Sequence, residues 1–188
     1  MASSVRQQGS EHRARDIAWW KDLIRDVPDF PTPGVVFRDI TPLLADPTAF
    51  EAVVEALASA FADKDVDKVV GVEARGFIVA SPVALRLGAG FVPMRKAGKL
   101  PWRIEAAEYQ LEYATERLEV HRDAVSPGER VIVVDDVLAT GGTAVAAVLL
   151  AERLGAQVVG LGFLVELLSL GGRRHLAGRE AVSLMEYE

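Results

Sequence analysis

The sequence predicts an α/β protein built on a central, mostly parallel sheet flanked by helices. Runs of β-branched apolar residues such as Val131–Val134 are typical of strands that are buried on both faces, as in parallel sheets. Segments with helical spacing alternate with these strands, and this alternation indicates a sheet with helices on both faces. The chain has 188 residues, which is long enough for one such domain with a sizeable core.

The composition limits the partners that the protein can have. A formal net charge of −6 argues against general affinity for nucleic acid or anionic membranes, so any anionic ligand needs a local cluster of cations. The apolar runs are far shorter than the roughly 20 residues that cross a bilayer, so we expect a soluble protein with no membrane partner. The chain has no cysteine, which is consistent with a cytoplasmic protein.

The N-terminal part of the chain predicts an extension, a helix and a stiff loop. Residues 1–15 are polar, carry charges of both signs and lack the apolar stretch of a secretion signal, so we expect disorder there. Residues 16–188 are expected to form a single domain. Apolar spacing predicts a short amphipathic helix over Asp16–Arg25. The prolines of Phe30–Leu44 fix the backbone and predict an irregular, stiff path.

The next segment predicts a helix, a strand and a second helix, with a ligand-facing corner between the last two. Asp46–Ala62 has helical spacing, with Asp46 or Thr48 near its start. Lys68–Glu73 is a second buried strand. The motif Glu73-Ala74-Arg75-Gly76 then has a glycine at a strand-to-helix corner, where open α/β sheets bind ligands. On the residues alone, an arginine that only stabilises its own loop is the alternative.

Three cations follow a third predicted strand, Phe91–Met94. Arg95, Lys96 and Lys99 form a candidate clamp for an anion in an otherwise acidic protein. A solvated basic patch is the alternative interpretation. Beyond them, Trp102–Tyr113 has mixed charge and no clear period, which predicts a mobile flap rather than part of the core.

The most informative segment is Val131–Thr143. A buried strand ends in the carboxylates Asp135 and Asp136, and the small residues Ala139–Thr143 then begin a helix that runs to Leu154. Free backbone N–H groups and the positive end of the helix dipole suit a phosphate dianion. The carboxylates would repel a polyphosphate lying against them but would accept hydrogen bonds from sugar hydroxyls. A sugar phosphate is therefore the predicted ligand, and neither a Walker A loop nor a dinucleotide fingerprint fits the spacing.

The remaining segments complete the sheet. Leu118–His121 and Gln157–Val165 predict strands, Ser169–His175 is a short polar connection with paired glycines, and Ala181–Tyr187 alternates as an edge strand does. All the predicted ligand loops follow strands, which indicates a single site at their carboxyl ends. These loops are Glu73–Gly76, Arg95–Lys99 and Asp135–Thr143.

Several separated motifs carry a resemblance to a known family. Asp135–Thr143 is similar to the phosphoribosyl-pyrophosphate motif of type I phosphoribosyltransferases, and Pro28–Ile40 looks like the base-binding signature of the adenine phosphoribosyltransferases in that family. The resemblance covers residues 16–188. It implies the type I phosphoribosyltransferase fold, with a small hood and a flexible flap at about residues 97–113. It also implies a pentosyltransferase that converts adenine and phosphoribosyl pyrophosphate to AMP and pyrophosphate, and a homodimer.

The resemblance implies three groups of binding residues. The group for ribose and 5′-phosphate is Asp135, Asp136, Ala139, Thr140, Gly141, Gly142 and Thr143. The group for pyrophosphate is Glu73, Ala74, Arg75, Gly76, Arg95, Lys96 and Lys99. The group for adenine is Val36, Phe37, Arg38 and Val137. Mg²⁺ is implied as the cofactor, bound through phosphoribosyl pyrophosphate with Asp135 and Asp136 as candidate ligands.

The stretch Tyr109–Tyr113 resembles the hood loop of the family, Tyr-x-Leu-Glu-Tyr, which closes over the ligand. It implies that Glu112 is the acid/base residue and that Tyr109 and Tyr113 belong to the closed flap. Arg75 is the second catalytic residue that the resemblance implies. Without the resemblance, Glu112 would be read as an ordinary solvated glutamate.

Two alternative functions remain open on the sequence. One is a phosphoribosyltransferase for a 6-oxopurine, orotate or uracil, against which the signature at Pro28–Ile40 and the loop at Tyr109–Tyr113 both count. The other is a DNA-binding regulator of the same fold that uses the phosphoribosyl site as a sensor. The acidic composition and the short N-terminal extension count against that regulator.

Overall fold

The computed structural model describes residues 17–110 and 115–188 of the chain. The extension predicted at residues 1–15 therefore lies outside the described residues. The chain divides into two compact units, Met1–Val53 and Val54–Glu188, and each is described by itself. Within the described residues, no helix is both long and apolar enough to cross a membrane.

The first unit contains a small antiparallel pair of strands. Residues 17–22 are helical, but the helix predicted over Asp16–Arg25 ends before Arg25, which begins strand β1 (Arg25–Val27). This strand pairs with β2 (Phe37–Asp39), and an ion pair joins Arg38 to Asp26 across the two strands. Main-chain pairing with a distant segment thus outweighs the helical spacing at the end of the predicted helix.

Two helices follow, α2 (Thr41–Ala45) and α3 (Pro47–Ala60). The carboxylate of Asp46 accepts hydrogen bonds from the main-chain N–H groups of Thr48 and Ala49, both at 2.9 Å. Because these N–H groups have no partner within the helix, the aspartate stabilises its first turn. The predicted helix and its start near Asp46 are confirmed.

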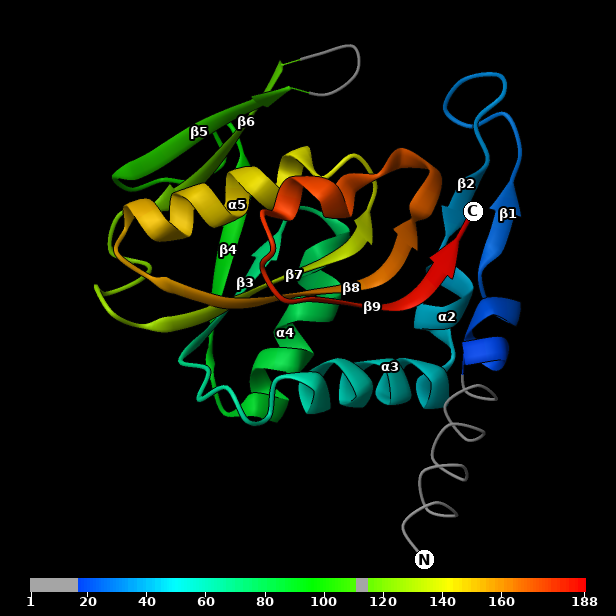
Figure 1. The fold of residues 1–188 in the computed structure, drawn as a ribbon, viewed down its shortest axis with the longest axis horizontal. Helices are drawn as coiled ribbons and strands as arrows, with labels where there is room; N and C mark the ends of the chain where they lie inside the picture. The colour runs from blue at the N-terminus through cyan, green and yellow to red at the C-terminus, as the bar shows by residue number, and fades with distance from the viewer. Residues whose placement is uncertain (1–16, 111–114) are drawn as a thin grey trace, which may run out of the picture. The chain divides into compact units, whose positions relative to one another are not determined.

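In the second unit, seven described strands form one sheet in the order β5-β6-β4-β3-β7-β8-β9 (Figure 1). The strands β4, β3, β7, β8 and β9 are parallel, and the hairpin β5–β6 is joined antiparallel to β4. The predicted mostly parallel sheet is confirmed. The strands are β3 (Lys68–Val72), β4 (Gly90–Lys96), β5 (Ile104–Gln110), β6 (Thr115–His121), β7 (Arg130–Leu138), β8 (Gln157–Leu167) and β9 (Ala181–Tyr187).

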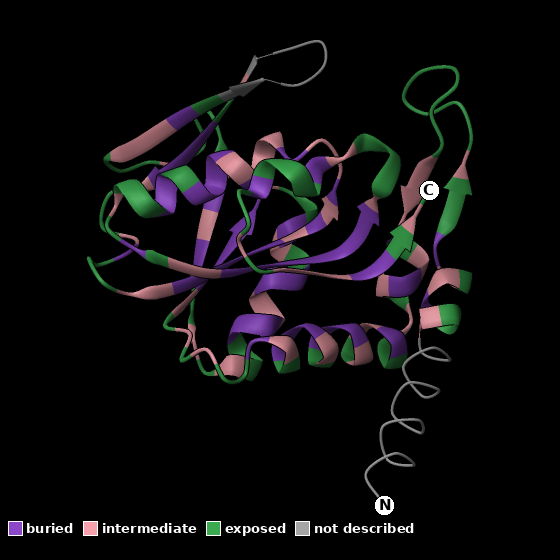
Figure 2. Ribbon diagram, viewed as in Figure 1, coloured by how far each residue is buried: buried purple, intermediate pink, exposed green. Residues whose placement is uncertain are grey.

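Helices α4 (Arg75–Leu87) and α5 (Gly142–Arg153) cover opposite faces of this sheet (Figure 1). The side chains of Val131–Val134 are fully buried, as expected for a strand covered on both sides. Figure 2 shows the buried residues concentrated in the strands and on the inner sides of the two helices. Two short 3₁₀ turns, η1 (Leu168–Leu170) and η2 (Gly172–Leu176), connect β8 to β9.

The segment predicted as an irregular flap is regular over most of its length. Ile104–Gln110 is strand β5, which pairs with β6 from Ile104 opposite His121 to Gln110 opposite Thr115. Ala107 is buried although charged residues, Glu105 and Glu108, lie close to it in the strand. Because β5 lies at the edge of the sheet, charged residues are tolerated there and hide the strand period. Residues 111–114 lie outside the described residues.

The core beneath β8 predicts how two glycines respond to substitution. A side chain on Gly160 would overlap the fully buried ring of Phe61, whereas one on Gly162 would lie 3.2 Å from the same ring. Gly160→Ala should lower the free energy of unfolding by about 1–3 kcal/mol, because overpacking exceeds the gain of under about 1 kcal/mol from a stiffer unfolded chain. Gly162→Ala, the matched control, should change it by less than Gly160→Ala does.

Urea denaturation of both variants measures this difference. Phe61→Leu in the Gly160→Ala background should recover part of the loss, because the shorter side chain makes room. Equal effects of the two alanines, or no recovery in the double variant, would mean that the ring does not set the space available beside β8.

Candidate functional site

The strand order places the ends of β3 and β7 side by side. The chain leaves β3 through α4 to reach β4, and it leaves β7 through α5 to reach β8 in the opposite direction. Right-handed crossovers that run in opposite directions put their helices on opposite faces of the sheet. Open α/β sheets bind ligands where neighbouring strands diverge in this way. The structure therefore brings together the predicted loops that follow β3 and β7.

The loop Ala139–Thr143 forms the turn between β7 and α5. Gly141 has a φ of +85°, and a side chain there would lie 2.6 Å from the carbonyl oxygen of Gly172. Helix α5 begins at Gly142, so the first N–H groups of the helix belong to this loop and have no intrahelical partner. A small cavity of about 90 Å³ is lined by the loop together with Asp135 and Val137. Its size and its donors suit a phosphate group.

The acidic doublet lies at the end of β7, where it is only partly neutralised. Asp136 is 6% exposed and accepts a short hydrogen bond from Arg75 Nε. Burial, and then the charge of Asp136, raise the pKa of Asp135 well above its ordinary value. A side chain on Gly76 would lie 2.6 Å from Asp135 Oδ1, so the start of α4 approaches the doublet closely. Two crowded carboxyl groups with one counter-charge favour hydroxyl donors or a cation.

Glu73 gathers the predicted cations. Its carboxylate accepts hydrogen bonds from Lys99 Nζ at 2.5 Å, Arg95 Nη2 at 3.2 Å and the main-chain N–H of Lys96 at 3.0 Å. The Lys96 ammonium pairs instead with Glu116 at 3.0 Å. Burial alone would raise the pKa of Glu73, but these hydrogen bonds outweigh it and lower the pKa to about 2. In this geometry Glu73 therefore holds the cations Arg95 and Lys99 in place. A carboxylate on its own would repel pyrophosphate.

The predicted adenine residues divide between the two units. In the first unit, Phe37 packs edge-on against Phe30 with ring centroids 5.3 Å apart, Arg38 pairs with Asp26, and Val36 is exposed. In the second unit, Val137 lies in β7 and lines the cavity at the phosphate loop.

One of the three predicted flap residues lies within the part of the chain that the structure describes. Tyr109 lies in β5, opposite Glu116 of β6. Glu112 and Tyr113 lie outside the described residues, so their roles stay predictions. The described part of the flap therefore includes strand β5.

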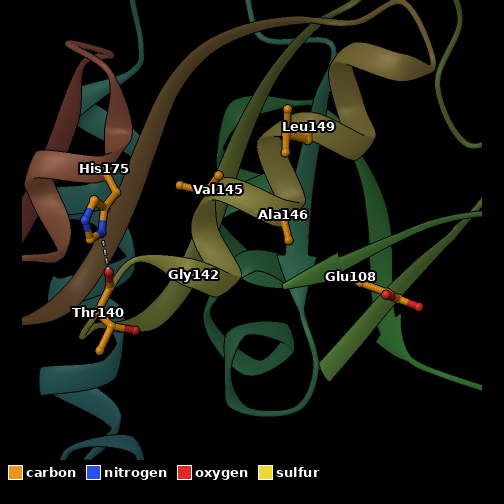
Figure 3. Close-up of a pocket in the computed structure, with 7 residues that line it drawn as sticks. All are labelled: Glu108, Thr140, Gly142, Val145, Ala146, Leu149 and His175. Atoms are coloured by element: carbon orange, nitrogen blue, oxygen red, sulfur yellow. Dashed lines mark hydrogen bonds between the residues drawn. The ribbon is translucent and has the colours of Figure 1, made fainter. Parts of the chain in front are cut away.

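Two residues that the sequence interpretation missed contact the phosphate loop from η2. Gly172 lies so close that a side chain would overlap the carbonyl oxygen of Ala139, and His175 Nδ1 lies 2.8 Å from the carbonyl oxygen of Thr140. The paired glycines in Ser169–His175 were the only signal. Figure 3 shows His175 directed at Thr140 on one side of an open cleft of about 480 Å³. Further residues that line the cleft include Glu108, Gly142, Val145 and Leu149.

Comparison with known proteins agrees with this architecture. A parallel sheet that carries an acidic doublet and a phosphate-sized loop at one strand-to-helix corner defines a sugar-phosphate-binding α/β protein. Residues 40–181 match the family model of the phosphoribosyl transferase domain. The chain belongs to this family, with the type I phosphoribosyltransferase fold, and within it to the group of the adenine phosphoribosyltransferases.

The relatives support that placement at high coverage. The adenine phosphoribosyltransferase of Acidothermus cellulolyticus is 62% identical over 162 residues, which cover 86% of this chain and 92% of the relative. The crystal structure of adenine phosphoribosyltransferase from Thermoanaerobacter pseudethanolicus has a TM-score of 0.89 and 48% identity, covering 91% of this chain and 99% of that one. The Saccharomyces cerevisiae enzyme, complexed with an imino-altritol bisphosphate and adenine, has a TM-score of 0.86 and 39% identity, covering 91% and 99%.

The low pKa of Glu73 predicts how acid affects stability. Because its pKa falls from 4.5 to about 2 on folding, the ionised group stabilises the fold above about pH 4.5, and this contribution is lost as the pH falls through about 2. Glu73→Gln removes the contribution. The difference in free energy of unfolding between wild type and variant should therefore be largest near neutral pH and shrink, by up to about 3 kcal/mol, towards pH 2.

Urea denaturation at a series of pH values measures this difference. Asp63→Asn, a change at an exposed carboxylate, is the control and should change the free energy of unfolding by less than Glu73→Gln does near neutral pH. A Glu73→Gln difference that does not shrink in acid would contradict the hydrogen-bonded cluster around Glu73.

Proposed function

We propose that this chain is an adenine phosphoribosyltransferase that converts adenine and phosphoribosyl pyrophosphate to AMP and pyrophosphate in purine salvage. The observation that carries the proposal is the doublet Asp135–Asp136, separated by only two residues from the loop Ala139–Thr143, in a chain of this family. Curated relatives at 62% and 59% identity bear that enzyme name. The net charge of −6 weighs against the DNA-binding alternative.

Transfer of the phosphoribosyl group breaks the bond between the anomeric carbon and pyrophosphate. The ribose then gains oxocarbenium character while the leaving group gains negative charge, so catalysis has to stabilise both. We assign the ribose hydroxyls to Asp135 and Asp136, whose charge favours the cationic ring. The 5′-phosphate is assigned to the N–H groups of Ala139–Thr143. Together they hold the two ends of one pentose.

The leaving group is assigned to the cations near Glu73. Arg95 and Lys99 are already positioned by the Glu73 carboxylate, and Arg75 by Asp136. Cations that are held in place before the ligand arrives need little reorganisation when charge develops on pyrophosphate. Pyrophosphate carries more negative charge than the single carboxylate with which it competes, so exchange of partners favours the ligand.

Magnesium fits this site as an ion that arrives with the substrate. In the part of the chain that the structure describes, no cluster of three or more acidic or histidine side chains is placed to hold a metal. Mg²⁺ often binds through one or two carboxylates together with substrate phosphates and water. The raised pKa of Asp135 marks a carboxyl that a nearby cation would help to ionise. We propose Asp135 and Asp136 as its protein ligands, and the ion would neutralise charge on the pyrophosphate.

Recognition of adenine is assigned to Val36, Phe37, Arg38 and Val137. Main-chain groups near Val36 and Arg38 can accept from the exocyclic amine of adenine and donate to a ring nitrogen. A 6-oxopurine presents the opposite pattern and would leave buried groups without partners. The base-binding signature at Pro28–Ile40 also leads us to propose adenine over other bases.

We also propose a homodimer, in the cytoplasm. Helix α4 carries the exposed apolar side chains Ile78 and Leu85, the latter 83% exposed, and such a face is suited to cover by a second copy. The cation clamp at Arg95–Lys99 begins within β4, the strand that comes after α4 in the chain. Light scattering of the purified protein would show twice the chain mass if the proposal holds.

An assay with a panel of bases tests the proposed function. With phosphoribosyl pyrophosphate and Mg²⁺, adenine should give AMP with a kcat/KM at least about 10³-fold above that for hypoxanthine or guanine, because a 6-oxo group mismatches the main-chain donors and acceptors. Omitting Mg²⁺ is the control and should remove most turnover. Preferential use of a 6-oxopurine, orotate or uracil, or no turnover together with DNA binding, would overturn the assignment.

The flap provides the acid/base prediction. We propose that Glu112 takes up the proton that adenine loses, and that the flap with Tyr109 and Tyr113 closes over the site. Glu112→Gln should lower kcat by about 10²-fold or more, since the amide cannot accept that proton. Glu105→Gln, a change in strand β5 of the same hairpin, is the matched control. An effect on KM alone would refute the acid/base role.

A further inference from the structure

The 3₁₀ turn η2 packs against the outer side of the phosphate loop. His175 and Gly172 are 35 and 33 residues away from the loop residues Thr140 and Ala139 in sequence, yet both contact the main chain there. These contacts involve main-chain atoms of the loop. Phosphate binding depends on main-chain N–H groups of this loop, so anything that fixes its peptides affects the binding site.

We propose that Gly172 and His175 are positioning residues for the 5′-phosphate, acting through the main chain of Ala139 and Thr140. This inference rests on the proposed function and adds to it. Neither residue is assigned a contact with substrate. Their effect is on the shape of the loop, and hence on the affinity for the phosphate end of the sugar.

The hydrogen bond from His175 has a defined direction. A carbonyl oxygen only accepts, so Nδ1 carries the proton and donates to Thr140. The peptide after Thr140 is trans, and in a trans peptide the C=O and N–H groups point in opposite directions. The bond that fixes the Thr140 carbonyl therefore also fixes the direction of the Gly141 N–H, in the loop that lines the phosphate cavity.

Gly172 limits the position of the loop by its size. An added side chain would overlap the Ala139 carbonyl oxygen and lie 2.8 Å from the nitrogen of Gly141. The φ of Gly172 is not in the left-handed region, so alanine fits its own backbone conformation. We therefore expect a substitution there to act by displacing the phosphate loop, and not through strain in the backbone of residue 172 itself.

Arg173, one of the two residues between them, anchors η2 to the sheet. Arg173 donates from Nε to Glu166 at 2.9 Å and from Nη1 to the carbonyl oxygen of Ala181 at 2.7 Å. Glu166 is only 3% exposed and also accepts from Ser183 Oγ at 2.7 Å. A hydrogen-bonded pair of this kind holds η2 on β8 and β9, so η2 can support the phosphate loop.

Steady-state kinetics and titration of ribose 5-phosphate and of adenine test the inference. His175→Ala should weaken ribose 5-phosphate binding and raise KM for phosphoribosyl pyrophosphate by about fivefold, the usual effect of one hydrogen bond. The KM for adenine should stay within about twofold, and so should all constants of the control Arg174→Ala, an exposed neighbour on the same turn. Gly172→Ala should have a larger effect than His175→Ala on the same two constants.

A conservative variant separates positioning from general structure. His175→Asn places an amide N–H near the position of Nδ1 and should restore most of the affinity, whereas His175→Gln places it one bond further out and should not. Thermal unfolding reports any variant that fails to fold, and the Asn and Gln pair decides the question if Gly172→Ala does so.

The possible outcomes distinguish this inference from the proposed function. Unchanged ribose 5-phosphate binding in His175→Ala and Gly172→Ala, equal losses for adenine and the sugar phosphate, or no difference between Asn and Gln would overturn it. A wild-type protein that binds ribose 5-phosphate but makes no AMP would overturn the proposed function alone, because the titrations need no turnover.

Discussion

The candidate site depends on main-chain approaches that are too close for any side chain. Gly76 leaves room for Asp135 where α4 meets β7, and Gly141 and Gly172 leave room for each other where η2 meets the phosphate loop. Each contact joins segments that are distant in sequence, so these glycines set the spacing between elements. The acidic doublet and the phosphate loop are thus fixed relative to each other by packing on two sides, before any ligand binds.

Charge pairing in the free chain is the second constraint. The chain is acidic overall, with a net charge of −6, and yet it has to attract a polyanion. Glu73 resolves this conflict because it remains ionised at neutral pH and keeps Arg95 and Lys99 at one corner. A ligand with higher charge can take these cations over without having to order them, since the ordering cost is already met in the folded chain.

The sequence predicted the parts of this protein that depend on local pattern. Val131–Val134 has only one good explanation, a strand buried on both faces, and the spacing to the doublet and loop then followed. It failed where pairing with distant residues decides the structure. Arg25 leaves the predicted helix to pair with Asp39, and Ile104–Gln110 forms an edge strand whose mixed charge hides its period. The assignment of Glu73 to the pyrophosphate-binding group stays a prediction, whereas its hydrogen bonds to Arg95 and Lys99 could not be predicted, because these residues are distant from it in sequence.

The contacts between η2 and the phosphate loop are also made by residues that are distant in sequence. They connect the candidate site to strands β8 and β9. The small residues that let this loop approach phosphate also give its backbone more conformational freedom. Without other contacts, a ligand would therefore have to order the loop when it binds. Contacts to its carbonyl groups can restrict the loop while leaving other N–H groups available. Those contacts hold only if η2 is itself fixed, and Arg173 fixes it through Glu166 and the main chain of Ala181. On this inference, we expect strand β8 and the edge strand β9 to contribute to phosphate affinity although neither is expected to touch the ligand.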